Sequence, residues 1–149
     1  FIKKFSEISI HELPLVGGKN ASLGEMFSQL TPKGILVPDG FAITADAYRL
    51  FLKENKLRER LEAMVGQLDK TNFSNLNDIG QQARDLIQNA TLPAAVVAEI
   101  KQAFQDLRGR EKADISLAVR SSATAEDLPS ASFADTCFNM FSFVITSIC

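Results

Sequence analysis

The chain has 149 residues, the size of one domain or one large subdomain. Hydrophobic residues make up 46% of it and charged residues 23%, which is ordinary for a globular protein with a buried core. The formal net charge of −2 argues against a general nucleic-acid or acidic-membrane surface, so we expect neither partner.

The first predicted helix follows residues 15–20, which read LVGGKN. We expect Asn20 as its N-cap, and Pro32 with Gly34 as its end. Its apolar face has the i, i+3, i+4, i+7 spacing of a helix, at Leu23, Met26, Phe27 and Leu30. Two short β-rich pieces follow, residues 35–37 and 41–43, divided by the turn signal Pro-Asp-Gly.

Four more helices are predicted from apolar stripes. They cover residues 45 to about 54, residues 56–68, residues 79–90, and a stretch that begins near Pro93 and has its last apolar residue at Leu107. Residues 115–120 then alternate between the two faces of a strand. The fold class expected from these elements is α+β, helix-rich, with a few short strands.

The last residues, 137–149, read CFNMFSFVITSIC and contain no charge, glycine or proline. Such a segment is prone to β-structure and aggregation unless the fold covers it. We expect a strand along residues 141–145 with an open edge, and self-association through the tail. The spacing of Cys137 and Cys149 matches no zinc site, and His11 is expected to be a surface residue, so no metal site is assigned.

The segment Gly17-Gly18-Lys19 lies ahead of a helix. Glycines let the backbone approach a ligand closely, a helix N-terminus attracts anions, and lysine adds a mobile positive charge for phosphate. An ordinary loop with an exposed lysine is the alternative, since GGK is not the Walker pattern.

A second candidate site is the hydroxyl-rich sequence after Arg120, in which Ser121, Ser122 and Thr124 can donate to phosphate oxygens. The planar fork of arginine suits bidentate phosphate binding. The alternative is a helix start capped by Thr124.

Three segments in this order, LVGGKNASLGEM, VPDGFAITADAYR and AVRSSATAEDLPSASFA, resemble the N-terminal part of the phosphoenolpyruvate synthase and pyruvate phosphate dikinase family. The resemblance covers residues 4–134. It implies that residues 1–134 form the N-terminal subdomain of an ATP-grasp nucleotide-binding domain, with residues 135–149 as a divergent apolar tail. By position, Lys19 and Arg120 are implied to bind the ATP phosphates. The further candidate contacts are Gly17, Gly18, Ser121, Ser122 and Thr124.

The resemblance also implies a phosphotransferase that converts ATP, pyruvate and water to phosphoenolpyruvate, AMP and phosphate by way of a pyrophosphorylated histidine, with Mg²⁺ required. No catalytic residue is assigned here. The second ATP-grasp half with its metal-binding carboxylates, the phosphohistidine domain and the pyruvate-binding domain are expected outside this chain. The family's glycine-containing phosphate loop is missing after Ala134. Weak nucleotide binding without turnover is therefore expected.

Two other functions stay open from the sequence. A related ATP-grasp dikinase with another acceptor, such as an antibiotic phosphotransferase, would share these motifs, because the acceptor is chosen by a domain outside the chain. A non-catalytic truncated remnant or interaction module is the alternative from a different class. With no signal peptide and no apolar run of the roughly 18 residues that a spanning helix needs, the expected location is the cytoplasm.

Overall fold

The computed structural model describes residues 1–110, 116–123 and 140–148. The chain divides into two compact units, one formed by Phe1–Tyr48 with Ala94–Cys149 and the other by Arg49–Pro93.

The first unit contains a four-stranded antiparallel sheet in the order β1-β2-β4-β3. Its strands are β1 (Ile2–Lys4), β2 (Gly40–Ile43), β3 (Ser116–Ala123) and β4 (Met140–Ile148). Strand β4 lies inside the sheet and pairs with β2 on one side and β3 on the other. The predicted strand over residues 141–145 is confirmed. Its predicted open edge is wrong for residues 144 and 145, which pair with β2 as well as with β3.

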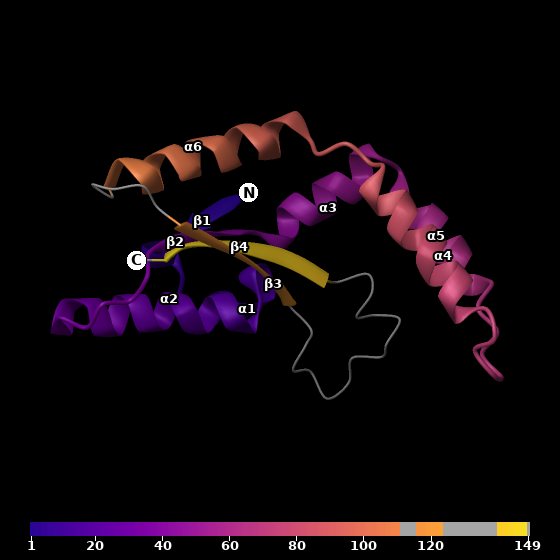
Figure 1. Cartoon of the computed structure of the whole chain (residues 1–149), viewed down its shortest axis with the longest axis horizontal. Coiled ribbons are helices and arrows are strands. Elements are labelled where there is room, and N and C mark those ends of the chain that lie inside the picture. Colours follow the sequence, from indigo (N-terminus) through magenta and orange to yellow (C-terminus); the bar gives the residue numbers. More distant parts are fainter. Residues whose placement is uncertain (111–115, 124–139, 149) are drawn as a thin grey trace. The chain divides into compact units, whose positions relative to one another are not determined.

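Both faces of the sheet are covered by helices, as the two neighbouring residues Phe41 and Ala42 of β2 show. Successive strand residues point to opposite faces. Ala42 packs in a cluster with Val16 and Ala21 of α1 (Leu13–Val16) and α2 (Gly18–Leu30). Phe41 packs with Ala103 and Leu107 of α6 (Ala94–Arg110). Figure 1 shows α6 on one side of the sheet and α2 on the other.

Short 3₁₀ segments complete this unit. They are η1 (Phe5–Glu7), η2 (Ile10–Glu12) and η3 (Thr31–Lys33). Helix α2 packs tightly on η1 and the residues after it: a Cβ atom added to Gly24 would come within 2.5 Å of the Ile8 Cβ. A half-exposed ion pair, Lys4 Nζ to Asp106 Oδ2 at 2.9 Å, joins β1 to α6.

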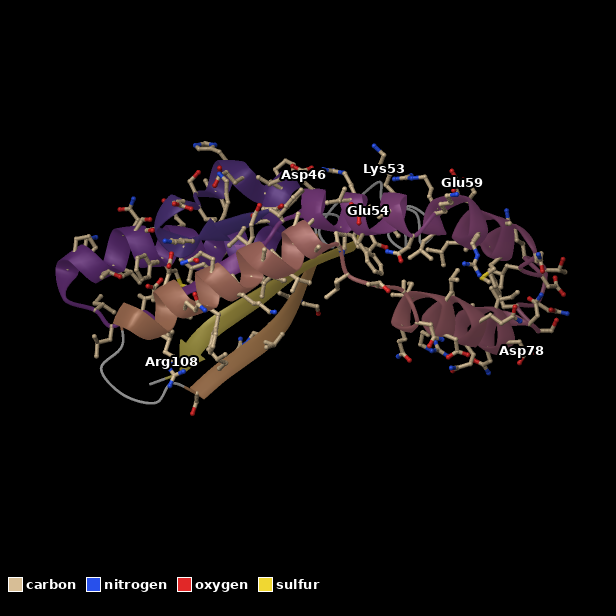
Figure 2. The ribbon with its side chains drawn as sticks, turned by 90° about the horizontal axis from the view of Figure 1, so that it is seen from above. Asp46, Lys53, Glu54, Glu59, Asp78 and Arg108 are labelled. Carbon is tan, nitrogen blue, oxygen red and sulfur yellow. The ribbon has the colours of Figure 1, made fainter. Side chains whose placement is uncertain are left out.

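The second unit is helical. It contains α4 (Leu57–Gly66), α5 (Leu76–Gln88) and the C-terminal part of α3 (Ala45–Glu54). Figure 2 shows Glu59 of α4 and Asp78 of α5 on the outer sides of the helix pair. Buried Leu57, Leu61 and Ile79 lie on the inner stripes of the two helices.

The predicted helices are confirmed, and so are the strands over residues 41–43 and 116–120. The predicted strand at residues 35–37 is wrong. Gly34 ends η3 in the left-handed conformation, none of the strands in the described part of the chain pairs with residues 35–37, and Leu36 is 98% exposed. The predicted Asn20 N-cap is also wrong, because α2 already begins at Gly18 with Gly17 as its N-cap.

Candidate functional site

The first half of the candidate site is the junction between α1 and α2. Gly17 joins these helices with φ 80° and ψ 161°, a combination open essentially to glycine alone. The Gly17 N–H donates to the Leu13 carbonyl at 2.9 Å, and the Gly17 carbonyl accepts from the Ala21 N–H at 3.0 Å. The abrupt turn allows a 13-residue helix to begin at Gly18, with its positive dipole end at the junction.

Asn20 supports this junction from inside, a role that the sequence analysis missed. Its side chain is fully buried, and its Nδ2 donates to the Val16 carbonyl at 2.7 Å. The bond links the first turn of α2 to the last residue of α1. A signal was present in the sequence: Asn20 occupies the same helical stripe as Leu23 and Phe27, where a polar residue must find a partner in the interior.

Lys19 lies in the first turn of α2 and its side chain is exposed. The buried residues of this helix are Asn20, Ala21 and Gly24, so α2 packs on the protein with one side and presents Lys19 outside that packed stripe. A positive charge here adds to the positive end of the helix dipole, and the two together favour an anion such as phosphate.

The second half of the candidate site is β3, on which Arg120 lies well inside the strand. Arg120 is in register with Val144 of β4, and Val144 is in register with Ala42 of β2. Directly opposed residues share a face of the sheet, so Arg120 lies on the face of Ala42. This is the face that α1 and α2 cover, and α2 packs against β3. Arg120 itself is exposed.

The two serines after Arg120 belong to β3, which continues beyond the strand predicted for residues 115–120. Ser122 lies on the same face as Arg120 and is buried, whereas Ser121 lies on the opposite face and is exposed. Thr124 and Ala134 lie outside the described residues. The two expected cations, Lys19 and Arg120, are thus carried by elements that pack together, and their binding to the ATP phosphates stays a prediction.

Over residues 1–110, 116–123 and 140–148, no three histidine, cysteine, aspartate or glutamate side chains gather as a metal site. His11 is exposed on η2, and its backbone N–H donates to Ser9 Oγ at 3.4 Å. In the same ranges no helix is long and apolar enough to cross a membrane.

Residues 13–143 match the family model described as "Pyruvate phosphate dikinase, AMP/ATP-binding domain". The chain belongs to this family. The match contains the α1–α2 junction and Arg120, and so both halves of the candidate site. The resemblance to the N-terminal nucleotide-binding region of phosphoenolpyruvate synthases is confirmed by the relatives as well.

Three curated relatives illustrate the match. The phosphoenolpyruvate synthase of Neisseria meningitidis is 50% identical over 131 residues, which cover 87% of this chain and 16% of that protein. The phosphoenolpyruvate synthase of Pseudomonas aeruginosa is 46% identical over 134 residues, 90% of this chain and 17% of the relative. The phosphoenolpyruvate synthase of Escherichia coli is 38% identical over 130 residues, which cover 87% of this chain and 16% of that protein. The chain thus spans about a sixth of the length of these relatives.

Proposed function

We propose that this chain forms one wall of an ATP site, with the α1–α2 junction and Arg120 facing the phosphates. One observation carries the proposal: α2 begins at a glycine turn with Lys19 in its first turn, and the same helix packs on the strand that carries Arg120. A helix start and two exposed cations on contacting elements are what a polyphosphate needs from a protein surface.

Each group has a separate task in this proposal. Gly17 and Gly18 let the backbone come close to a phosphate oxygen, since they lack side chains. Lys19 supplies a mobile point charge, and Arg120 supplies a planar fork that binds two oxygens at once. Buried Ser122 supports the strand beside Arg120. Mg²⁺ would neutralise further phosphate charge, and we place its ligands outside this chain.

We further propose that residues 1–134 form the N-terminal subdomain of an ATP-grasp fold and that this subdomain works within a phosphoenolpyruvate synthase-like phosphotransferase. The names of the relatives favour pyruvate over another acceptor. The second ATP-grasp half, the phosphohistidine and the pyruvate-binding domain would come from segments outside these 149 residues, as the length of the relatives suggests. Phosphoryl transfer depends on positioning all of these parts.

The test of the proposed wall is an ATP titration of the full chain, followed by calorimetry or amide NMR shifts. We expect weak binding that Lys19→Gln and Arg120→Gln each weaken by about tenfold, because each removes a charge-assisted contact worth about 1.5 kcal/mol. Adenosine carries no phosphate, so its binding should not change in either variant.

Matched controls are Lys70→Gln and Arg58→Gln, which remove the same charges from exposed positions of the second unit. Both should keep ATP affinity within about twofold of the parent chain. A folded chain that does not bind ATP, or controls that lose as much affinity as the site variants, would refute the proposed wall.

Turnover gives a separate test. With ATP, Mg²⁺ and pyruvate, the 149-residue chain should form no AMP or phosphoenolpyruvate, because it corresponds to about a sixth of the relatives that carry the synthase name. Detection of either product with the purified chain would contradict the proposal that the phosphohistidine and the pyruvate-binding domain come from segments outside these 149 residues.

Self-association through residues 137–149 remains a further proposal, which rests on the uncharged, apolar sequence of that segment. Light scattering on the full chain tests it. A dimer that a charged substitution in the segment dissociates supports it, and a monomer at all accessible concentrations refutes it.

A further inference from the structure

Helices α4 and α5 leave a groove of about 480 Å³ between them. The groove is built from residues 55–90 alone, so it contains none of the candidate phosphate contacts. Its volume falls within the range of roughly 300–1,000 Å³ that is typical of small-molecule sites. Figure 2 shows Glu59 and Asp78 directed to the outer sides of this helix pair, away from the groove between them.

Each of the two helices contributes apolar side chains and one charged side chain to the groove. On α4, Leu57, Arg60 and Met64 follow the i, i+3, i+7 spacing of one helix face. On α5, the adjacent residues Asp85 and Leu86 face the same space. Leu57 is buried, and Met64 and Leu86 are half-buried, so apolar side chains line the interior while the charged groups stand at the rim.

The charged groups of the groove have capacity left for a ligand. Among the residues that the structure describes, none makes a hydrogen bond or ion pair with Arg60, whereas its neighbour Arg58 lies 3.9 Å from Glu62. Asp85 accepts a hydrogen bond from Gln81 Nε2 at its Oδ1, at 2.7 Å. Within the same part of the chain, its Oδ2 has no hydrogen-bond donor.

Asn55 lines the groove and makes three hydrogen bonds to backbone groups. Its Nδ2 donates to the carbonyls of Phe51 and Thr91, both at 2.9 Å, and its Oδ1 accepts the Thr91 N–H at 3.1 Å. These bonds hold the start of α4 against the segment that follows α5. A lining residue that is already fixed loses little conformational entropy when a ligand binds.

We propose that this groove is a second ligand site, which takes a small zwitterion with an apolar tail, the chemistry of a free apolar α-amino acid. The carboxylate binds the fork of Arg60, the ammonium group binds Asp85, and the side chain lies on Met64 and Leu86. The negative charge of Asp85 would repel a ligand that is only an anion. The positive charge of Arg60 would repel a ligand that is only a cation. Only a ligand that carries both charges complements both Arg60 and Asp85.

The probe is L-leucine, titrated into the full chain and followed by amide NMR shifts. We expect saturable shifts at groove residues with a dissociation constant in the millimolar range, as fits a few solvent-exposed contacts. Two analogues each lack one charge: 3-methylbutylamine has no carboxylate, and 4-methylpentanoate has no ammonium group. Each should bind about tenfold more weakly than leucine, since each loses one charge-assisted contact.

The variants are Arg60→Gln and Asp85→Asn, matched by Arg58→Gln and Asp78→Asn on the same two helices. The first pair should weaken leucine binding by about tenfold, and the second should leave it within about twofold. All four positions are exposed, so circular dichroism should show a folded chain throughout.

Leucine without saturable shifts, an analogue that binds as tightly as leucine, or equal losses in Arg60→Gln and Arg58→Gln would each overturn the site. The ATP affinity of the Arg60→Gln variant should be that of the parent chain. A failure of this proposal is therefore distinguishable from a failure of the proposed ATP wall.

Discussion

Gly17 is the residue on which the candidate phosphate site depends most directly. With φ 80° and ψ 161° it turns the chain between α1 and α2 so that the second helix can begin at Gly18. Side chains are excluded from that conformation by clashes with their own backbone. Buried Asn20 then ties the two helices together through the Val16 carbonyl. The position of Lys19 follows from these neighbours.

We therefore predict that Gly17→Ala destabilises the chain by about 1–3 kcal/mol, because alanine must adopt a conformation open essentially to glycine alone. Gly66→Ala is the control: a Cβ atom there meets nothing within 4 Å, and Gly66 has no positive φ. It should change stability by less than about 1 kcal/mol, in the stabilising direction. Urea unfolding measures both. Equal stability of the two variants would contradict the account of the junction.

Asp69 provides a pH-dependent test at the turn between α4 and α5. The Thr71 backbone N–H donates to its carboxylate at 2.9 Å, and the Ser74 hydroxyl donates at 3.2 Å. These bonds, that from Thr71 most of all, hold the pKa of Asp69 below its usual value. A lowered pKa in the folded state means that the carboxylate contributes stability above the unfolded pKa, and that this contribution is lost as pH falls through the folded one.

We predict that Asp69→Asn lowers the urea midpoint at pH 7, and that its difference from the parent chain shrinks as pH falls below about 3.9, the ordinary pKa of an aspartate. Glu54→Gln removes a charge from the exposed end of α3 and is the control. A difference between Asp69→Asn and the parent that stays constant from pH 7 to pH 2 would show that the turn is not held by the carboxylate.

At the scale of elements, the helices could be predicted from the sequence. Their apolar residues repeat with the period of a helix and lie between proline and glycine signals. Strand β3 was readable from its alternation. Strand β1 has three residues and no alternation to detect, so it was not foreseen. Residues 35–37 look like a strand, but strand formation depends on a partner, and none of the described strands pairs with them.

The candidate site could be predicted only in part from the sequence, because part of its geometry also depends on pairing between distant segments. Glycines before a helix and an arginine in a strand are local signals, and the structure has the α1–α2 junction and β3 where they suggested. Which face of the sheet Arg120 occupies depends on strand register. Register is set by pairing between segments distant in sequence, which no local pattern specifies for a short strand.

The close packing of Gly24 in α2 against Ile8 predicts how a substitution at Gly24 affects stability. A Cβ atom on Gly24 would lie 2.5 Å from the Ile8 Cβ and 2.6 Å from the Ile8 carbonyl oxygen. Because backbone cannot move aside as a flexible side chain can, Gly24→Ala should destabilise the chain by about 1–3 kcal/mol despite alanine's better helix propensity. Thermal unfolding checks this. A more stable Gly24→Ala variant would mean that α2 does not pack on Ile8.

At the scale of the whole molecule, β4 holds the sheet of the first unit together. It lies between β2 and β3, so that within the described residues the strand bearing Arg120 is joined to the rest of the sheet only through β4. The uncharged sequence of the tail, which suggested an exposed edge, also suits a strand whose neighbours lie on both sides.

A chain that ends at Ala134 should consequently lose the cooperative unfolding of the sheet and melt at a lower temperature than the full chain. Its helical signal from the Arg49–Pro93 unit should persist, because that unit contains no residue of the sheet. Circular dichroism melts compare the two chains. An unchanged melting temperature would contradict the central position of β4.

The central claim, that Lys19 and Arg120 bind the phosphates of one nucleotide, is tested most directly by a double-mutant cycle on ATP binding. The parent chain, Lys19→Gln, Arg120→Gln and the double variant are titrated under the same salt conditions. If both cations bind the same polyphosphate, we predict a coupling energy of about 0.5 kcal/mol or more between them. Losses that add to within about 0.3 kcal/mol would place the two side chains at separate sites and contradict the claim.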